Sequence, residues 1–129
     1  MTAGLSELEK RGLPSTVFVP TGLLGGEGFW WDLLAANDEP LEPAVRDHVL
    51  EKLHGDGTRA VAWAREEGRP IADLPGHAHP LSEDELLALE TEGVTFGAHT
   101  VSHANLPVLA ESEVRNELVE SRRWLEQRT

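Results

Sequence analysis

The sequence contains no cysteine. A disulfide framework, a thiolate nucleophile and a cysteine-based zinc or iron–sulfur site are therefore excluded, and any metal must be bound by histidines and carboxylates. Basic residues are also scarce, because 11 Lys and Arg stand against 23 Asp and Glu, which gives a formal charge of −12 at pH 7. Most of such a surface would repel a phosphate backbone, so nucleic acid is not expected as a partner.

Long apolar runs are missing as well, and none approaches the roughly 20 residues that cross a bilayer as a helix. The 129 residues, 40% hydrophobic and 26% charged, have the composition of one small folded domain. The first ten residues include Glu7 and Glu9 and lack the basic start and apolar middle of a signal peptide. These residues encode no export signal, and the cellular location stays open.

Helical and extended segments alternate along the chain, an order typical of α/β folds in which helices connect parallel strands. The sequence predicts strands at residues 15–19 and 94–98, the first of them apolar enough to be buried on both faces. Residues 21–28 form a Gly-rich loop, and residues 69–80 form an irregular connector that contains three prolines. The predicted helices cover residues 5–11, 29–34, 43–54, 58–67, 82–92 and 111–128.

Two of these helices carry further local signals. Ser82 and Glu85 have the spacing of a capping box, and Gly93 marks the end of the helix that they begin. In the last helix, Glu111 and Arg115 are spaced for an i, i+4 ion pair. The apolar face expected for that helix consists of Val114, Leu118 and Leu125.

Two histidines follow the second predicted strand, His99 directly after its end and His103 four residues later. Parallel sheets bind ligands at the carboxyl ends of their strands, so this position suits a functional site. On a helical turn, imidazoles four residues apart face the same side and can bind one cation at about 2.0–2.1 Å. His99 and His103 are therefore candidate ligands of a divalent metal, and a further ligand must come from elsewhere in the fold.

The spacing of the pair also has a simpler interpretation, in which one neutral imidazole is buried against a backbone carbonyl and the other is solvated. The remaining histidines are weaker candidates. His77 and His79 lie in the Pro-rich connector without a strand to orient them, and we expect them on a surface loop. His48 and His54 fall on predicted helices, where we expect them on a solvated face.

Four tryptophans supply most of the aromatic surface. Trp30 and Trp31 could stack on a sugar ring, although at least one of them is expected in the core. Trp63 and Trp124 lie on predicted helices and are expected to be packing residues.

Two separated stretches resemble the polysaccharide deacetylase (NodB-homology) family. The first is Gly-Leu-Pro-Ser-Thr-Val-Phe-Val-Pro-Thr-Gly at residues 12–22, followed by Trp30-Trp31-Asp32. The second is residues 93–106, which contain His99-Thr100-Val101-Ser102-His103, similar to the family's His-[Ser/Thr]-x-x-His motif. The family usually has Pro after the second histidine, whereas this chain has Ala104.

The resemblance extends over about residues 5–128, so residues 1–129 are expected to be part of one deacetylase domain. It implies an α/β fold, a partial distorted (β/α) barrel that is rich in helices and has few parallel strands. Residues 37–80 resemble a helical insertion that only some members have. A barrel reduced to a few strands leaves edges and apolar faces uncovered, so we expect either self-association or helices that cover the sheet.

The resemblance also implies an activity, the metal-dependent removal of N- or O-linked acetyl groups from glycans such as chitin oligomers, peptidoglycan or acetylxylan. His99 and His103 would bind a divalent metal, usually zinc, and the hydroxyl of Thr100 would steady the loop between them. The substrate would be an acetylated glycan, and the reaction a hydrolysis at carbon–nitrogen bonds that are not peptide bonds, or at esters.

One expected motif is missing. The family's Asp-Asp pair, which supplies a third metal ligand and the catalytic base, would precede Leu5, and no Phe-Asp-Asp occurs in the chain. Asp32 and Asp56 lack the strand-end context of that motif. The motifs that bring the general acid would follow Thr129. We therefore expect an incomplete catalytic set and an inactive isolated chain, and the alternative is a non-catalytic binding or assembly domain that retains the fold.

Overall fold

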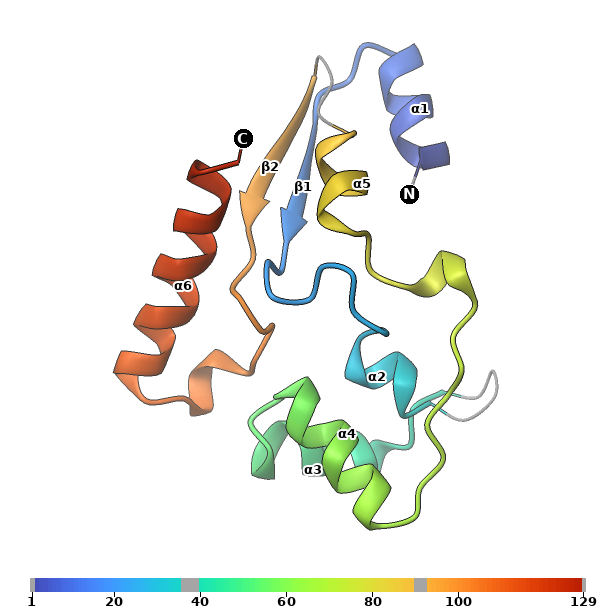
Figure 1. The fold of residues 1–129 in the computed structure, drawn as a ribbon, viewed down its shortest axis with the longest axis vertical. Coiled ribbons are helices and arrows are strands. Elements are labelled where there is room, and N and C mark those ends of the chain that lie inside the picture. The colour runs from blue at the N-terminus through green and yellow to red at the C-terminus, as the bar shows by residue number, and fades with distance from the viewer. Residues whose placement is uncertain (1, 36–39, 90–92, 129) are drawn as a thin grey trace.

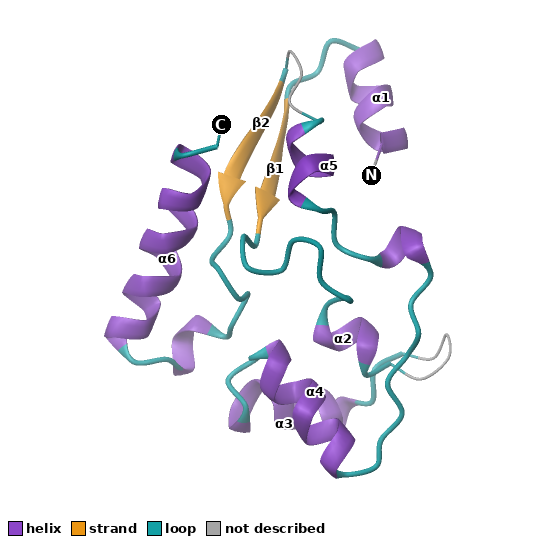
Figure 2. Ribbon diagram, viewed as in Figure 1, coloured by secondary structure: helices purple, strands orange, loops and turns teal. Residues whose placement is uncertain are grey.

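The computed structural model describes residues 2–35, 40–89 and 93–128 (Figure 1). Two strands, six α-helices and two short 3-10 helices alternate along these residues (Figure 2). Their bounds are α1 Thr2–Lys10, β1 Ser15–Val19, α2 Trp30–Leu33, α3 Pro43–Lys52, α4 Gly57–Glu66, η1 Gly76–Ala78, α5 Glu83–Leu87, β2 Val94–Ala98, η2 Leu106–Val108 and α6 Glu111–Glu126.

Both predicted strands are confirmed, and they pair in parallel. The register runs from Ser15 opposite Val94 to Val19 opposite Ala98. An α/β fold rich in helices, with few parallel strands, is therefore what the described residues show. A closed barrel is not formed by this two-stranded sheet, and the barrel stays a prediction, as does the assignment of residues 37–80 to an insertion.

The prediction that the first strand is buried on both faces is wrong. Exposure alternates along β1, so that Val19 is buried whereas the ring of Phe18 is 63% exposed. Helix α6 packs against β2 (Figure 1). The opposite face of the sheet carries Thr16 and Thr95, whose hydroxyls lie 2.9 Å apart, beside Phe18. A run of apolar residues does not show which of its two faces the rest of the fold covers.

Glycines and caps end the helices near the predicted positions. Gly12 and Gly68 follow α1 and α4 with φ of 62° and 67°, the left-handed conformation that glycine tolerates. The capping box of α5 is present, since Ser82 and Glu85 exchange side-chain and backbone hydrogen bonds. That helix ends at Leu87 and not near Gly93 as predicted, and residues 90–92 lie outside the described part.

A layer of helices lies beyond the carboxyl ends of the strands (Figure 1). Its core contains Trp30 of α2, Val49 of α3 and Ala60 of α4, and Trp63 packs against it, which confirms the packing role predicted for Trp63. His48 does not decorate a solvated face as expected, because its ring is partly buried and stacks on Trp63 at 4.3 Å.

The last helix differs from its prediction in two ways. Leu125 is buried as expected, whereas Leu118 is 50% exposed. The expected Glu111–Arg115 ion pair is absent from the part of α6 that is described. The helix instead pairs Arg122 with Glu126 and Arg123 with Glu120. The packing of α6 against β2 sets which of its residues are covered, and the local periodicity alone does not.

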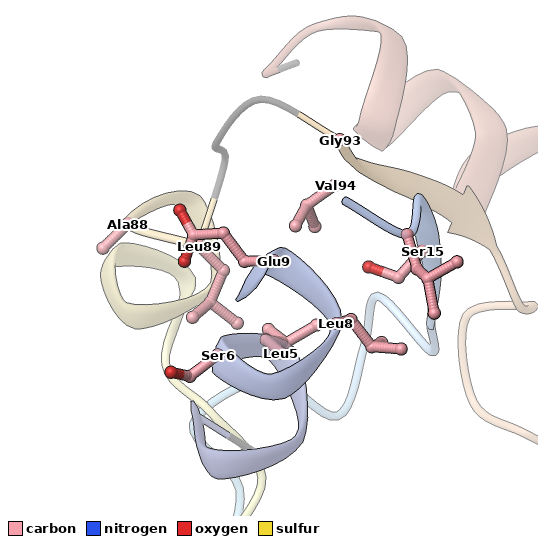
Figure 3. A pocket seen from close by; sticks show the side chains of 10 residues that line it. Leu5, Ser6, Leu8, Glu9, Ser15, Ala88, Leu89, Gly93 and Val94 are labelled. Carbon is pink, nitrogen blue, oxygen red and sulfur yellow. The ribbon is translucent and has the colours of Figure 1, made fainter. Parts of the chain in front are cut away.

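A groove of about 170 Å³ lies between α1, α5 and the starts of both strands (Figure 3). Leu5, Leu8 and Leu89 give it apolar walls, and Glu9 stands at its side. This groove is at the amino ends of the strands, opposite to the end from which His99 leaves the sheet. None of the described helices has the length and hydropathy that a membrane span requires.

Candidate functional site

The site lies where both strands end. Hydrogen bonds extend the parallel pairing beyond the strands, from His99 N–H to the Val19 carbonyl at 2.9 Å and from Gly22 N–H to the Val101 carbonyl at 2.8 Å. A Cβ atom at Gly22 would approach the Val101 carbonyl oxygen to 2.8 Å, so only glycine allows this contact. The Gly-rich loop thereby holds the segment that carries the histidines.

The two imidazoles converge. The Nε2 atoms of His99 and His103 lie 3.1 Å apart, with ring centroids at 4.8 Å. The convergence does not come from a helical turn, as the spacing predicted, because residues 99–103 form a loop. Thr100 and His103 adopt φ of 68° and 58°, and these two left-handed residues turn the chain back on itself.

The hydroxyl of Thr100 closes this turn. Its Oγ1 atom accepts a hydrogen bond from the His103 backbone N–H at 3.0 Å and donates one to the His99 carbonyl. The contacts give Thr100 the position from which it can steady the loop, the role that the sequence resemblance implied. A hydroxyl also explains why a β-branched residue occupies a left-handed position that usually disfavours it.

His103 lies against aromatic rings of the segment that begins α2. Its ring meets Trp31 at 5.2 Å and Phe29 at 5.9 Å, both edge to face, and those two rings stack on each other at 4.6 Å. Burial, and secondarily the neighbouring His99, lower the pKa of His103 below its ordinary value. The neutral imidazole is the form that binds metal, so the surroundings favour the ligand state.

The loop between the histidines is also held from α6. The carboxylate of Glu117 accepts hydrogen bonds from the backbone N–H groups of Val101 and Ser102 and from the Ser102 hydroxyl, at 2.8, 2.9 and 2.8 Å. Sequence reasoning did not single out Glu117. Its role depends on hydrogen bonds to residues that lie 15 and 16 positions earlier in the sequence. The sequence alone shows only an acidic residue on a predicted helix.

The turn between α3 and α4 contacts the chain directly after His103. The His54 carbonyl accepts a hydrogen bond from the Asn105 N–H at 2.8 Å, and Gly55 packs against the same residue. His54 therefore lies in a turn with φ of 61° and not on a helix face as predicted. The helical segment supports the histidine loop through its backbone.

His103 borders two cavities. One, of about 430 Å³, lies between the Gly-rich loop, α2 and α4, and the other, of about 520 Å³, lies between α2, α3 and residues 104–107. Trp31 lines both cavities. Trp30, which also borders both, is only 7% exposed and belongs to the core, as predicted for at least one of the pair.

The donor set of the pair fits a metal. Two nitrogens bound to one tetrahedral zinc at 2.0–2.1 Å would lie about 3.3 Å apart, close to the separation of the Nε2 atoms. No third histidine or carboxylate joins them within the described residues. Asp56 instead caps α4 by accepting from the Arg59 N–H, and His79 contacts the Leu74 carbonyl.

The family model described as polysaccharide deacetylase matches residues 1–129. No curated protein and no solved structure matches the chain. Since the family match covers the whole sequence, including both stretches of the resemblance, the chain belongs to the polysaccharide deacetylase family.

Proposed function

We propose that this chain is part of a metal-dependent hydrolase that removes acetyl groups from a glycan, with His99 and His103 as two ligands of a divalent cation, most simply zinc. The facing Nε2 atoms at 3.1 Å are the observation that carries the proposal. Family membership supports the deacetylase class of reaction, at amide carbon–nitrogen bonds or at esters.

The residues of the site would have different roles in binding the metal. His99 and His103 supply neutral nitrogen donors, and Thr100 fixes the loop that aims them. A bound divalent cation polarises the acetyl carbonyl and lowers the pKa of water. Trp31 and Phe29 cover one side of the His103 ring and limit its rotation, which keeps its Nε2 directed at His99.

The surroundings also suit a sugar. Trp31 lies in the walls of both cavities beside His103, and aromatic rings pack against the apolar faces of pyranoses. An acetylated glycan bound along these cavities would pass next to the His103 imidazole. We assign Trp31, and not the buried Trp30, as the aromatic residue that contacts substrate.

The catalytic set in residues 1–129 is incomplete under this proposal, because no carboxylate of the described residues accompanies the histidines. A general base and a general acid each contribute roughly 10²- to 10⁴-fold to such a hydrolysis. The isolated chain should therefore release no acetate from an acetylated chito-oligosaccharide. Chelator-sensitive release by the purified chain would overturn the claim of incompleteness.

Calorimetric titration of the chain with zinc tests the metal site. The chain should bind one zinc, His99→Ala and His103→Ala should each weaken binding at least tenfold, and the exposed His77→Ala should leave it unchanged. Binding that survives both site variants would remove the basis of the proposal.

The alternative function is a non-catalytic binding or assembly domain that retains the deacetylase fold. It is favoured by the observation that no third histidine or carboxylate joins the pair within the part of the chain that the structure describes. In that case Nε2 of one imidazole donates a hydrogen bond to Nε2 of the other, and zinc is not bound. Glycan binding that is independent of zinc, together with a zinc titration that shows no binding, would select this alternative.

A further inference from the structure

One contact of the site connects an element far along the chain to the histidine loop. Helix α6 begins eight residues after His103, and its Glu117 side chain reaches back to that loop. We propose that Glu117 is a positioning residue that sets the orientation of His99 and His103 for metal binding. The inference rests on the proposed function and adds to it a residue with no ligand role of its own.

The hydrogen bonds of Glu117 engage both of its oxygens. Oε2 accepts from the Val101 and Ser102 N–H groups, and Oε1 accepts from the Ser102 hydroxyl. An ionised carboxylate makes such bonds shorter and stronger than neutral acceptors do. Because both of its oxygens bind the loop, Glu117 holds the loop in place and does not serve as a third metal ligand.

The backbone N–H groups of Val101 and Ser102 take their hydrogen-bond partner from outside the loop. With Thr100 and His103 in the left-handed region, residues 101 and 102 lie at the tip of the turn, where no helical bond satisfies their N–H groups. Glu117 binds both of these N–H groups, and the Thr100 hydroxyl binds that of His103. The three consecutive amides between the imidazoles are thereby fixed.

Fixing these amides fixes the rings. The peptide planes at 101 and 102 determine how the Cα–Cβ bonds of His99 and His103 are aimed, and the rings must keep two Nε2 atoms 3.1 Å apart. The support is itself rigid, because Ser121 and Leu125, one and two turns further along α6, are buried. The anchor is therefore a packed helix and not a mobile side chain.

Four variants of the 129-residue chain test this role. Glu117→Ala removes all three hydrogen bonds, Glu117→Gln keeps one carbonyl acceptor, and Ser102→Ala removes one bond and keeps the charge. Glu126→Ala is the matched control, since Glu126 lies on the same helix, is exposed and pairs only with Arg122 in the described residues.

Zinc affinity by calorimetry and amide hydrogen exchange of residues 101 and 102 by NMR are the two readouts. We expect Glu117→Ala to weaken zinc binding about tenfold or more and to speed exchange at both amides. Glu117→Gln should recover part of both effects, Ser102→Ala should give a smaller loss, and Glu126→Ala should match the unchanged chain.

The outcomes distinguish a failure of the positioning role from a failure of the metal site. Zinc binding that is unchanged in folded Glu117→Ala overturns the positioning role and leaves the metal site intact. If the unchanged chain binds no zinc, the metal site fails, and hydrogen exchange alone decides whether Glu117 holds the loop. If Glu117→Ala does not fold, unchanged affinity and exchange in Ser102→Ala and Glu117→Gln overturn the inference.

Discussion

Thr100 combines an unfavourable backbone conformation with two hydrogen bonds, which makes it a sensitive probe of the histidine loop. Thr100→Val keeps the shape and the β-branch of the side chain and replaces the hydroxyl by a methyl group. Both side chains are β-branched, so the backbone strain expected at a φ of 68° is similar in the two proteins and largely cancels. What remains is the loss of the hydrogen bonds to His99 and His103.

The magnitude follows from those two bonds. A neutral hydrogen bond contributes about 0.5–1.5 kcal/mol net, and a partly buried N–H left without an acceptor costs about 1–3 kcal/mol. The His103 N–H is partly buried and donates to the Thr100 hydroxyl. Thr100→Val should therefore lower the free energy of unfolding by about 2 kcal/mol. Thr100→Ser retains the oxygen and should stay within about 0.5 kcal/mol of the unchanged chain.

Urea unfolding of the three metal-free proteins, followed by tryptophan fluorescence, measures these differences. The slope of the unfolding free energy against urea should be the same in all three, because the exposed surface does not change. Equal stability of Thr100→Val and the unchanged chain would refute the reasoning, as would a Thr100→Ser variant that is as unstable as Thr100→Val.

Two further predictions concern the cap of α5 and the exposed face of the sheet. The Ser82 side chain and, secondarily, the Ser82 backbone lower the pKa of Glu85 below 4.5, so the stability from this carboxylate is present above pH 4.5 and is lost as pH falls through the lowered pKa. Ser82→Ala should raise that pKa in an NMR titration, and an unchanged titration would contradict the assignment. Phe18→Ser should reduce self-association in sedimentation experiments, because Phe18 is the large exposed ring of the uncovered sheet face, with little loss of stability.

Local chemistry determined the elements that the sequence predicted well. The strand at residues 15–19 is set between two prolines, and the start of α5 is fixed by the capping box of Ser82. The ends of α1 and α4 follow from glycines that adopt positive φ. These signals act within a few residues, so they can be read without knowledge of the rest of the fold.

Features that depend on contacts across the chain could not be read in the same way. The exposure of Phe18 depends on which face of the sheet α6 covers, and the stacking of His48 on Trp63 depends on how α3 meets α4. Glu117 belongs to the same class, since only the packing of α6 brings it to the histidine loop. The motif predicted that the two imidazoles meet, and it did not predict which contacts bring them together.

The contacts that bring the imidazoles together affect how the motif would bind a metal. On a helix, the i, i+4 spacing of two histidines would be enough to bring their rings together, because the backbone hydrogen bonds of the helix already fix its geometry. In this loop the convergence depends on Thr100 and His103 in left-handed conformations, which cost free energy. Glu117 from α6 and the His54 carbonyl from the α3–α4 turn supply partners that offset this cost. Metal affinity should therefore respond to substitutions in α6 that touch no ligand, which a self-sufficient helical pair would not show.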